Sequence, residues 1–127
     1  MTIRGIGIDL ITYSKARKFL STHGREKANR LLTASEKKTW AAKSFSERHF
    51  SCLLAAKEAC FKAQNRAWMG TQGFSDIEVN TGSRGEFQVS ARNSGKGPVC
   101  RGWGSFFSND KYVGAQVILW DNTPECG

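Results

Sequence analysis

Features that would identify a membrane, secreted or zinc-binding protein are missing from this chain of 127 residues. No apolar run approaches the ~18 residues that a membrane-spanning helix needs, so we expect no transmembrane segment and no membrane partner. The first residues lack a basic stretch followed by an apolar one, which predicts no secretory signal and a cytoplasmic location. Four cysteines are present, but their spacing matches neither a zinc-ligand pattern nor a Cys-x-x-Cys motif, and this favours reduced thiols.

Negative charge is also scarce. The chain has 11 acidic residues against 19 lysines and arginines, a formal net charge of +8. This excess predicts an acidic partner, which could be nucleic acid, a membrane surface, an acidic protein or a polyanionic small molecule. Because the basic residues are scattered and form no recognised nucleic-acid-binding motif, we expect no nucleic-acid partner.

The length favours a single domain, which we place at residues 1–120, followed by a mobile tail at 121–127. One strand is expected near the N-terminus, helices in the middle and an antiparallel group at the end, which together predict an α+β fold. The expected strands cover residues 3–11, 76–80, 86–90 and 112–120, and residues 99–107 alternate irregularly within the antiparallel group.

The middle of the chain has helical patterns. The run Thr33-Ala34-Ser35-Glu36 is a capping-box pattern and predicts a short helix that begins there. The longest predicted helix covers residues 46–67, where apolar residues form one broad arc. Lys57 points into this arc, so its ammonium must either snorkel to solvent or meet an anion. Two further helical segments are expected at residues 12–20 and 24–32.

Two acidic residues from different elements form the main candidate site. Asp9 ends a strand-like apolar run, and Glu58 lies on the alanine-rich part of the long predicted helix, next to Lys57 and four residues before Lys62. Mg²⁺ is usually bound by one or two carboxylates together with substrate phosphates. The two carboxylates therefore predict a Mg²⁺ site and chemistry on a phosphate ester or anhydride.

Each of these residues also has a simpler interpretation. Asp9 alone would serve as a helix N-cap or a turn residue. Glu58 and Lys62 alone would form an exposed salt bridge along the helix. Gly5 and Gly7 share the strand face of Asp9, and we expect their missing side chains to leave room for a ligand.

The chain resembles the holo-acyl-carrier-protein synthases, the small trimeric class of 4′-phosphopantetheinyl transferases. The resemblance extends to about Leu119, and its most specific part is Lys57-Glu58-Ala59 followed by Lys62, together with Asp9. The segments that carry it are Gly5-Ile6-Gly7-Ile8-Asp9-Leu10, Arg30-Leu31-Leu32-Thr33-Ala34-Ser35-Glu36, Ala55-Ala56-Lys57-Glu58-Ala59-Cys60-Phe61-Lys62-Ala63, Phe74-Ser75-Asp76-Ile77-Glu78-Val79 and Tyr112-Val113-Gly114-Ala115-Gln116-Val117-Ile118.

The resemblance implies an antiparallel sheet packed on a long helix, and a homotrimer with coenzyme A between neighbouring subunits. It implies an enzyme that transfers 4′-phosphopantetheine from coenzyme A to a serine of an acyl carrier protein, with Mg²⁺ as cofactor and release of 3′,5′-ADP. Such a reaction serves fatty acid or polyketide biosynthesis. An acidic carrier protein would also account for the net charge, with Lys15, Arg17 and Lys18 as candidates for its docking face.

The resemblance assigns roles to individual residues. Asp9 and Glu58 match the metal ligands of the family, and Lys57 and Lys62 match lysines that contact the coenzyme A phosphates. The predicted catalytic residues are therefore Asp9, Glu58 and Lys62. Arg66 completes the predicted coenzyme A contacts of Lys57 and Lys62, because a guanidinium can replace backbone amides at a phosphate. The alternative for Arg66 is a solvated residue at a helix end.

Four segments differ from the family pattern: 53–54, 65–67, 85–87 and 105–108. At 65–67 the chain has Asn-Arg-Ala where the family usually has Gly-Thr-Gly, and 105–108 contains no histidine. These differences leave a second interpretation open, a repurposed or inactive family member. Such a protein would bind a carrier protein or a phosphopantetheine group without transferring it.

Overall fold

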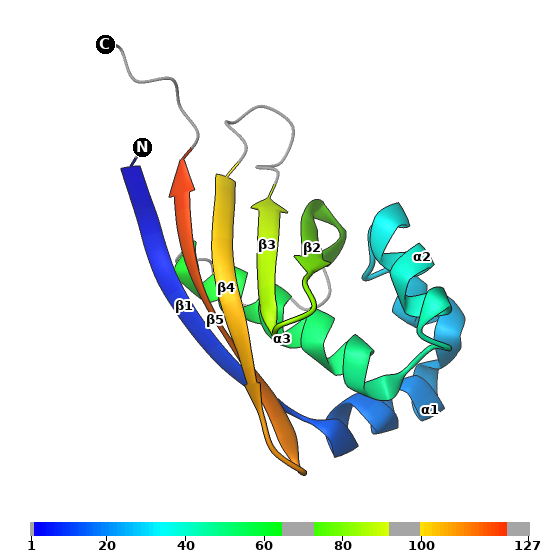
Figure 1. Cartoon of the computed structure of the whole chain (residues 1–127). Coiled ribbons are helices and arrows are strands. Elements are labelled where there is room, and N and C mark those ends of the chain that lie inside the picture. Colours follow the sequence, from blue (N-terminus) through cyan, green and yellow to red (C-terminus); the bar gives the residue numbers. More distant parts are fainter. Residues whose placement is uncertain (1, 65–72, 92–99, 122–127) are drawn as a thin grey trace.

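The computed structural model describes residues 2–64, 73–91 and 100–121 and has an α+β fold, as predicted. Helices and strands follow the expected order along the chain (Figure 1). The elements are β1 (Thr2–Thr12), α1 (Tyr13–Asn29), α2 (Ala34–Ala42), α3 (Glu47–Ala63), the 3₁₀ turn η1 (Phe74–Asp76), β2 (Ile77–Thr81), β3 (Glu86–Ala91), β4 (Cys100–Ser108) and β5 (Tyr112–Asp121). Within these described ranges, no helix has the length and apolar character needed to cross a membrane.

The five strands form one antiparallel sheet in the order β1-β5-β4-β3-β2. The N-terminal strand therefore pairs with the last strand of the chain, and Asp9 lies opposite Ala115. Figure 1 shows α3 crossing behind the sheet, with α1 and α2 beyond the β2 edge. One face of the sheet is thus covered by α3, and the other faces away from the helices.

The core lies between α3 and the covered face of the sheet. The alternating residues of β5 point into it as predicted, since Val113, Ala115, Val117 and Leu119 are each no more than 1% exposed. Gly5 and Gly7 lie against α3, where a Cβ on either would overlap the carbonyl oxygens of Ala63 and Ala59. The expectation that these glycines make room for a ligand is wrong, because the space is filled by the helix backbone.

Several boundaries differ from the expectation. β1 continues to Thr12 because its pairing with β5 extends that far, so Asp9 lies inside the strand rather than at its end. Thr12, not Asp9, caps the following helix by accepting a hydrogen bond from the amide of Lys15. The two helical segments expected at 12–20 and 24–32 are both present: they make up the two parts of α1, which meet at a kink where Gly24 has a non-helical φ of 78°.

The capping box is present as predicted: Thr33 and Glu36 exchange side-chain and backbone hydrogen bonds at the start of α2. Cys52, Cys60 and Cys100 are free thiols. The predicted tail at 121–127 lies outside the described residues, except for Asp121 at the end of β5.

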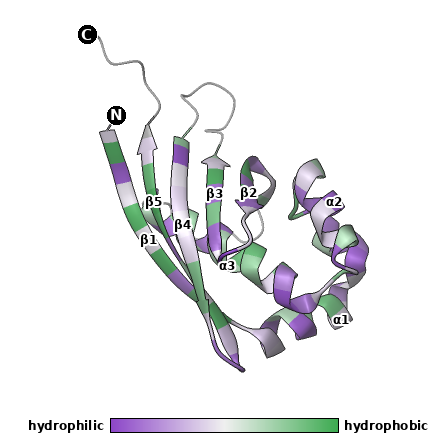
Figure 2. Ribbon diagram, viewed as in Figure 1, coloured by the Kyte–Doolittle hydropathy of each residue, from purple (hydrophilic) through white to green (hydrophobic). Residues whose placement is uncertain are grey.

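The uncovered face of the sheet is apolar on its β1 side. Hydrophobic bands recur along β1 in Figure 2, where alternation places Ile6, Ile8 and Leu10 away from α3. All three are more than half exposed. The strand register aligns Ile6 with Ile118 and then with Trp103, and these two side chains are also exposed. Together they form a continuous apolar surface across three strands.

Candidate active site

Asp9 and Lys62 meet where β1 crosses α3. The Lys62 ammonium donates a hydrogen bond of 2.5 Å to Oδ1 of Asp9. The Lys62 side chain is 59% exposed, whereas that of Asp9 is 11% exposed. The hydrogen bond to Asp9, helped by the charges of Asp9 and Glu58, raises the pKa of Lys62. The second oxygen of Asp9, Oδ2, is buried and has no hydrogen-bond partner in the described part of the chain.

Glu58 lies beside Asp9, one helical turn before Lys62. Burial and the neighbouring Asp9 carboxylate raise the pKa of Glu58 to about 8, against the opposing charges of Lys15 and Lys62. Two adjacent carboxylates cannot both ionise easily, because each repels the charge of the other. Lys62 forms its ion pair with Asp9. The simpler interpretation, an exposed salt bridge between Glu58 and Lys62, is therefore not what the structure shows.

The residues of this site fit a Mg²⁺ ion. A divalent cation would relieve the repulsion between the Asp9 and Glu58 carboxylates and would offer a partner to the buried Oδ2. Within the described residues, no group of three or more His, Cys, Asp and Glu side chains could hold a metal. A site with two carboxylates leaves the remaining positions of an octahedral ion to water and substrate phosphates.

An apolar cavity of about 140 Å³ adjoins Glu58. Glu58 and Lys15 are the charged residues in its lining, so α1 contributes to the site as well as α3 and β1. Lys15, a predicted docking residue, also acts on Glu58, since its positive charge lowers the pKa of that carboxyl. No pattern in the sequence connects these two residues, because they belong to different helices. The lining residues are Ile11, Lys15, Ala16, Phe19, Leu31, Leu54, Glu58 and Phe74.

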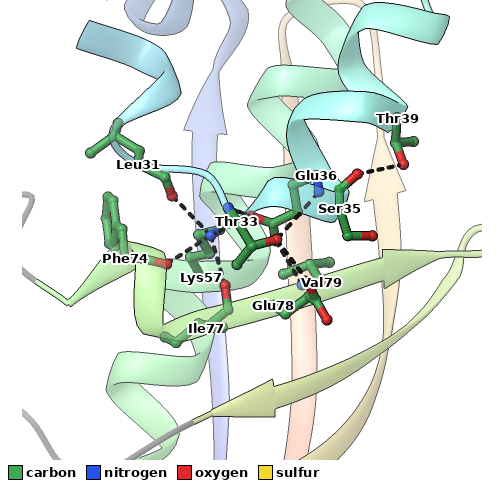
Figure 3. A network of polar contacts seen from close by, with 10 residues as sticks. All are labelled: Leu31, Thr33, Ser35, Glu36, Thr39, Lys57, Phe74, Ile77, Glu78 and Val79. Carbon is green, nitrogen blue, oxygen red and sulfur yellow. Dashed lines mark hydrogen bonds and ion pairs between the residues drawn. The ribbon is translucent and has the colours of Figure 1, made fainter. Parts of the chain in front are cut away.

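Lys57 lies outside this site. Its side chain is fully buried, and its ammonium lies 2.7 Å from Oε1 of Glu36 (Figure 3). It also donates to the carbonyl oxygens of Leu31, Phe74 and Ile77 at 2.7–2.9 Å. Burial lowers the pKa of Lys57, and the Glu36 carboxylate opposes this shift.

These contacts decide two predictions about Lys57. The prediction that Lys57 must snorkel or meet an anion is confirmed, because it meets Glu36. A direct contact of Lys57 with a coenzyme A phosphate is incompatible with this arrangement. The ammonium has no exposed surface, and its three N–H groups already face four oxygen atoms.

Two other segments singled out in the sequence are not part of the described site. Arg66 lies outside the described residues. The segment 105–108 lies at the end of β4, where Ser105 accepts a hydrogen bond from the side-chain amide of Gln116. The structure therefore brings together Asp9, Glu58 and Lys62 from the predicted set and places Lys57 in a separate buried network.

Comparisons with known proteins identify the family. The profile of the 4′-phosphopantetheinyl transferase superfamily matches residues 5–117. A holo-[acyl-carrier-protein] synthase of Wigglesworthia glossinidia brevipalpis is 30% identical over 96% of this chain and 95% of its own length. A synthase of Chlamydia pneumoniae is 35% identical over 67% of this chain and 70% of its own length. For a synthase of Blochmanniella floridana the identity is 35%, but the match covers only 62% of that protein.

Solved structures agree with the fold. A holo-[acyl-carrier-protein] synthase of Neisseria meningitidis superposes with a TM-score of 0.76 at 22% identity, covering 94% of this chain and all of that one. The Helicobacter pylori synthase, solved in complex with coenzyme A, has a TM-score of 0.70 at 19% identity and covers 91% of this chain and 99% of that one.

The chain belongs to the 4′-phosphopantetheinyl transferase superfamily, a family of group-transferring enzymes. The resemblance noted in the sequence is thereby confirmed.

Proposed function

We propose that this chain transfers 4′-phosphopantetheine from coenzyme A to a serine hydroxyl of an acyl carrier protein, with Mg²⁺ as cofactor. The main support is the pairing of two carboxylates, Asp9 and Glu58, with one largely exposed lysine, Lys62. This combination suits a cation and a diphosphate. The relatives named holo-[acyl-carrier-protein] synthase support the choice of donor and acceptor.

In the proposed reaction the serine oxygen attacks the β-phosphorus of coenzyme A. A new phosphoester bond forms, the P–O bond of the diphosphate breaks, and 3′,5′-ADP leaves while the serine proton passes to solvent or to the departing phosphate. Such transfers depend mainly on positioning and charge stabilisation, without a protein nucleophile. A bound Mg²⁺ would neutralise charge on the diphosphate.

Lys62 is the residue most able to exchange partners. Its ammonium is largely exposed and bound only to Asp9 in the described structure. Water reaches this ammonium, so the lysine can turn to a phosphate at a smaller cost than a fully buried lysine could. We assign Lys62 to the diphosphate and to the charge that develops on 3′,5′-ADP. Arg66 remains a candidate for a further phosphate contact.

We also propose a homotrimer formed through the uncovered apolar surface of the sheet. Ile6, Ile118 and Trp103 lie next to one another there, and their exposed area would gain from burial against a neighbouring copy. Light scattering should give the mass of three chains, and Ile6→Asp should reduce it. A wild-type mass of one chain at all concentrations would contradict the trimer.

The basic residues of α1 provide the proposed docking face for an acidic carrier protein. Lys15 and Lys18 are exposed, and Arg17 is paired with Glu47 at 2.9 Å at the surface. Electrostatic docking of this kind should weaken steeply with added salt.

The test of the proposed function is the intact mass of an acyl carrier protein incubated with this chain, coenzyme A and Mg²⁺. We expect the mass to rise by one phosphopantetheine group. Two controls should stay unmodified: the reaction with a chelator, and a carrier whose acceptor serine is replaced by alanine. Glu58→Gln should modify the carrier far more slowly than the wild type does. An unmodified carrier that still binds this chain would favour the repurposed family member instead.

A further inference from the structure

The buried pair of Lys57 and Glu36 connects segments that are distant in the sequence. Lys57 belongs to α3 and Glu36 to α2. The other three oxygens around the ammonium are the carbonyls of Leu31, between α1 and α2, and of Phe74 and Ile77, at either end of η1 (Figure 3). One ammonium therefore holds α3, the start of α2 and the entry to β2 in a fixed relation.

The Glu36 carboxylate completes the network. Its Oε1 accepts from the backbone amide of Thr33 at 2.8 Å as well as from Lys57, and its Oε2 accepts from the amide of Val79 at 2.7 Å. The Thr33 hydroxyl in turn donates to Glu78 on β2. A buried network whose members are all paired is rigid, because any movement would leave a polar group without its partner.

This network borders the cavity beside Glu58. Leu31 and Phe74 contribute their carbonyls to Lys57 and also line the cavity that Glu58 lines. The ammonium therefore holds the backbone of two cavity walls.

Lys57 and Glu58 are also consecutive residues of one helix, so they point about 100° apart around its axis. Lys57 points toward α2 and β2, while Glu58 points toward Asp9 on β1. Fixing Lys57 therefore fixes the rotation of α3 at Glu58.

We propose that Lys57 and Glu36 are positioning residues. Their contact sets the rotation of α3 and the walls of the cavity, and it thereby holds Glu58 against Asp9. Neither residue contacts the reacting atoms. The effect on catalysis rests on the proposed transferase function, whereas the effect on the position of the cavity walls does not.

Stability alone need not be the reason for this pair. Well-packed apolar residues of similar volume are often as stabilising as a buried ion pair, because desolvation of the two charges offsets their attraction. A lysine and a glutamate fix direction and distance in a way that an apolar contact does not. The pair therefore suits a place where the rotation of one helix must be set accurately.

Glu36→Gln is the most selective test. Glutamine preserves the shape of the side chain and the capping-box bond to Thr33. Glutamine has one accepting oxygen, whereas the carboxylate has two. It therefore cannot accept hydrogen bonds from Thr33, Lys57 and Val79 as the carboxylate does. Lys57→Met is a second variant that removes the ammonium but retains an unbranched side chain. Leu119→Ala serves as the control, because it opens the core at β5 and removes none of the hydrogen bonds of the network.

Two readouts separate positioning from simple stabilisation. The first is the NMR methyl signals of Leu31 and Leu54, which line the cavity, against Val117, which lies in the β5 core. The second is steady-state transfer to a carrier protein. In Glu36→Gln we expect the Leu31 and Leu54 signals to move and that of Val117 to stay. We expect kcat to fall about tenfold while KM for coenzyme A changes less than about twofold, the pattern of an interaction needed in the transition state.

Leu119→Ala should lower the melting temperature at least as much as Glu36→Gln does. It should nevertheless keep kcat within about twofold of the wild-type value. A folded Glu36→Gln with unmoved Leu31 and Leu54 signals and unchanged kcat would overturn the proposal. If the wild type transfers nothing, the proposed function fails, and the methyl signals of both network variants still decide whether the pair positions the cavity walls.

Discussion

Two lysines of α3, five residues apart, each bind a carboxylate, and the two pairs lie in opposite surroundings. In the pair of Lys57 and Glu36 the side chains are 0% and 1% exposed, whereas in the pair of Lys62 and Asp9 they are 59% and 11% exposed. Five positions along a helix correspond to about 140° around its axis, so one lysine faces the interior and the other the surface. The comparison separates a lysine fixed by the fold from one free to bind a ligand.

Solvent explains why the two pairs behave differently. The Lys57 ammonium would lose four oxygen partners if it moved, and no water could replace them. Lys62 can exchange Asp9 for water or for a phosphate at a smaller cost. A position beside Glu58 in the sequence therefore does not by itself make a lysine a phosphate ligand.

The largest expected effect is on stability. Lys57→Met should lower the free energy of unfolding by about 3–5 kcal/mol, because Glu36 is left as an uncompensated buried charge. Lys62→Met should lower it by about 1 kcal/mol or less. Adding Glu36→Gln to Lys57→Met should recover part of the loss. Urea denaturation measures all three, and equal losses for the two lysines would remove the distinction between the pairs.

The next effect is on activity. Asp9→Asn and Glu58→Gln should each reduce transfer about 10²–10³-fold, since each removes a charge that, in the proposed reaction, would hold the cation on the diphosphate. Both variants should remain folded by circular dichroism. Asp110→Asn, at an exposed acid between β4 and β5, is the control and should transfer normally. Full activity of either site variant at millimolar Mg²⁺ would contradict the metal assignment.

A smaller effect is expected on coenzyme A binding. Lys62→Met should raise the dissociation constant about tenfold, because a hydrogen bond to a charged group contributes roughly 1.5–3 kcal/mol. Lys38→Met, at an exposed lysine of α2, is the control and should bind as the wild type does. Calorimetric titration gives both constants, and identical values would exclude Lys62 as a phosphate contact.

Arg66→Ala distinguishes the two interpretations of that residue in the same titration. A guanidinium on a phosphate predicts a dissociation constant about tenfold higher. A solvated residue at a helix end predicts unchanged binding and a loss of only a few tenths of a kcal/mol in stability.

The smallest effect concerns pH in the absence of metal. The raised pKa of Glu58, about 8, means that the folded protein holds a proton that the unfolded chain releases near 4.5. The melting temperature should therefore fall as the pH rises from 4.5 to 8, and Glu58→Gln should remove this slope. Burial lowers the pKa of His49 below 6.5, which opposes the slope by favouring the folded state as the pH rises toward 6.5. A wild-type slope equal to that of Glu58→Gln would contradict the contact between Asp9 and Glu58.

Local patterns predicted much of this molecule. Alternation identified the buried face of β5, and the capping box placed the start of α2. The pairing of Asp9 with Glu58 came from residue types and family spacing. In the structure the Asp9 carboxylate lies close enough to Glu58 to raise the pKa of that carboxyl. The ambiguity of Lys57 was visible as well, because a lysine in an apolar arc requires an anion or a path to water.

The tertiary structure decided which residue each charged side chain pairs with. Periodicity indicates which face of an element is buried, but it carries no information on which distant segment covers that face. Glu36, 21 residues before Lys57, reaches its ammonium only because α2 packs beside β2 and α3. Lys62 binds Asp9 rather than Glu58 because β1 crosses α3 closely, and that approach depends on Gly5 and Gly7 lying against the helix backbone. From the sequence, the same two glycines were expected to make room for a ligand. A glycine leaves the same gap whether a helix backbone or a ligand fills it, so the sequence does not distinguish the two cases.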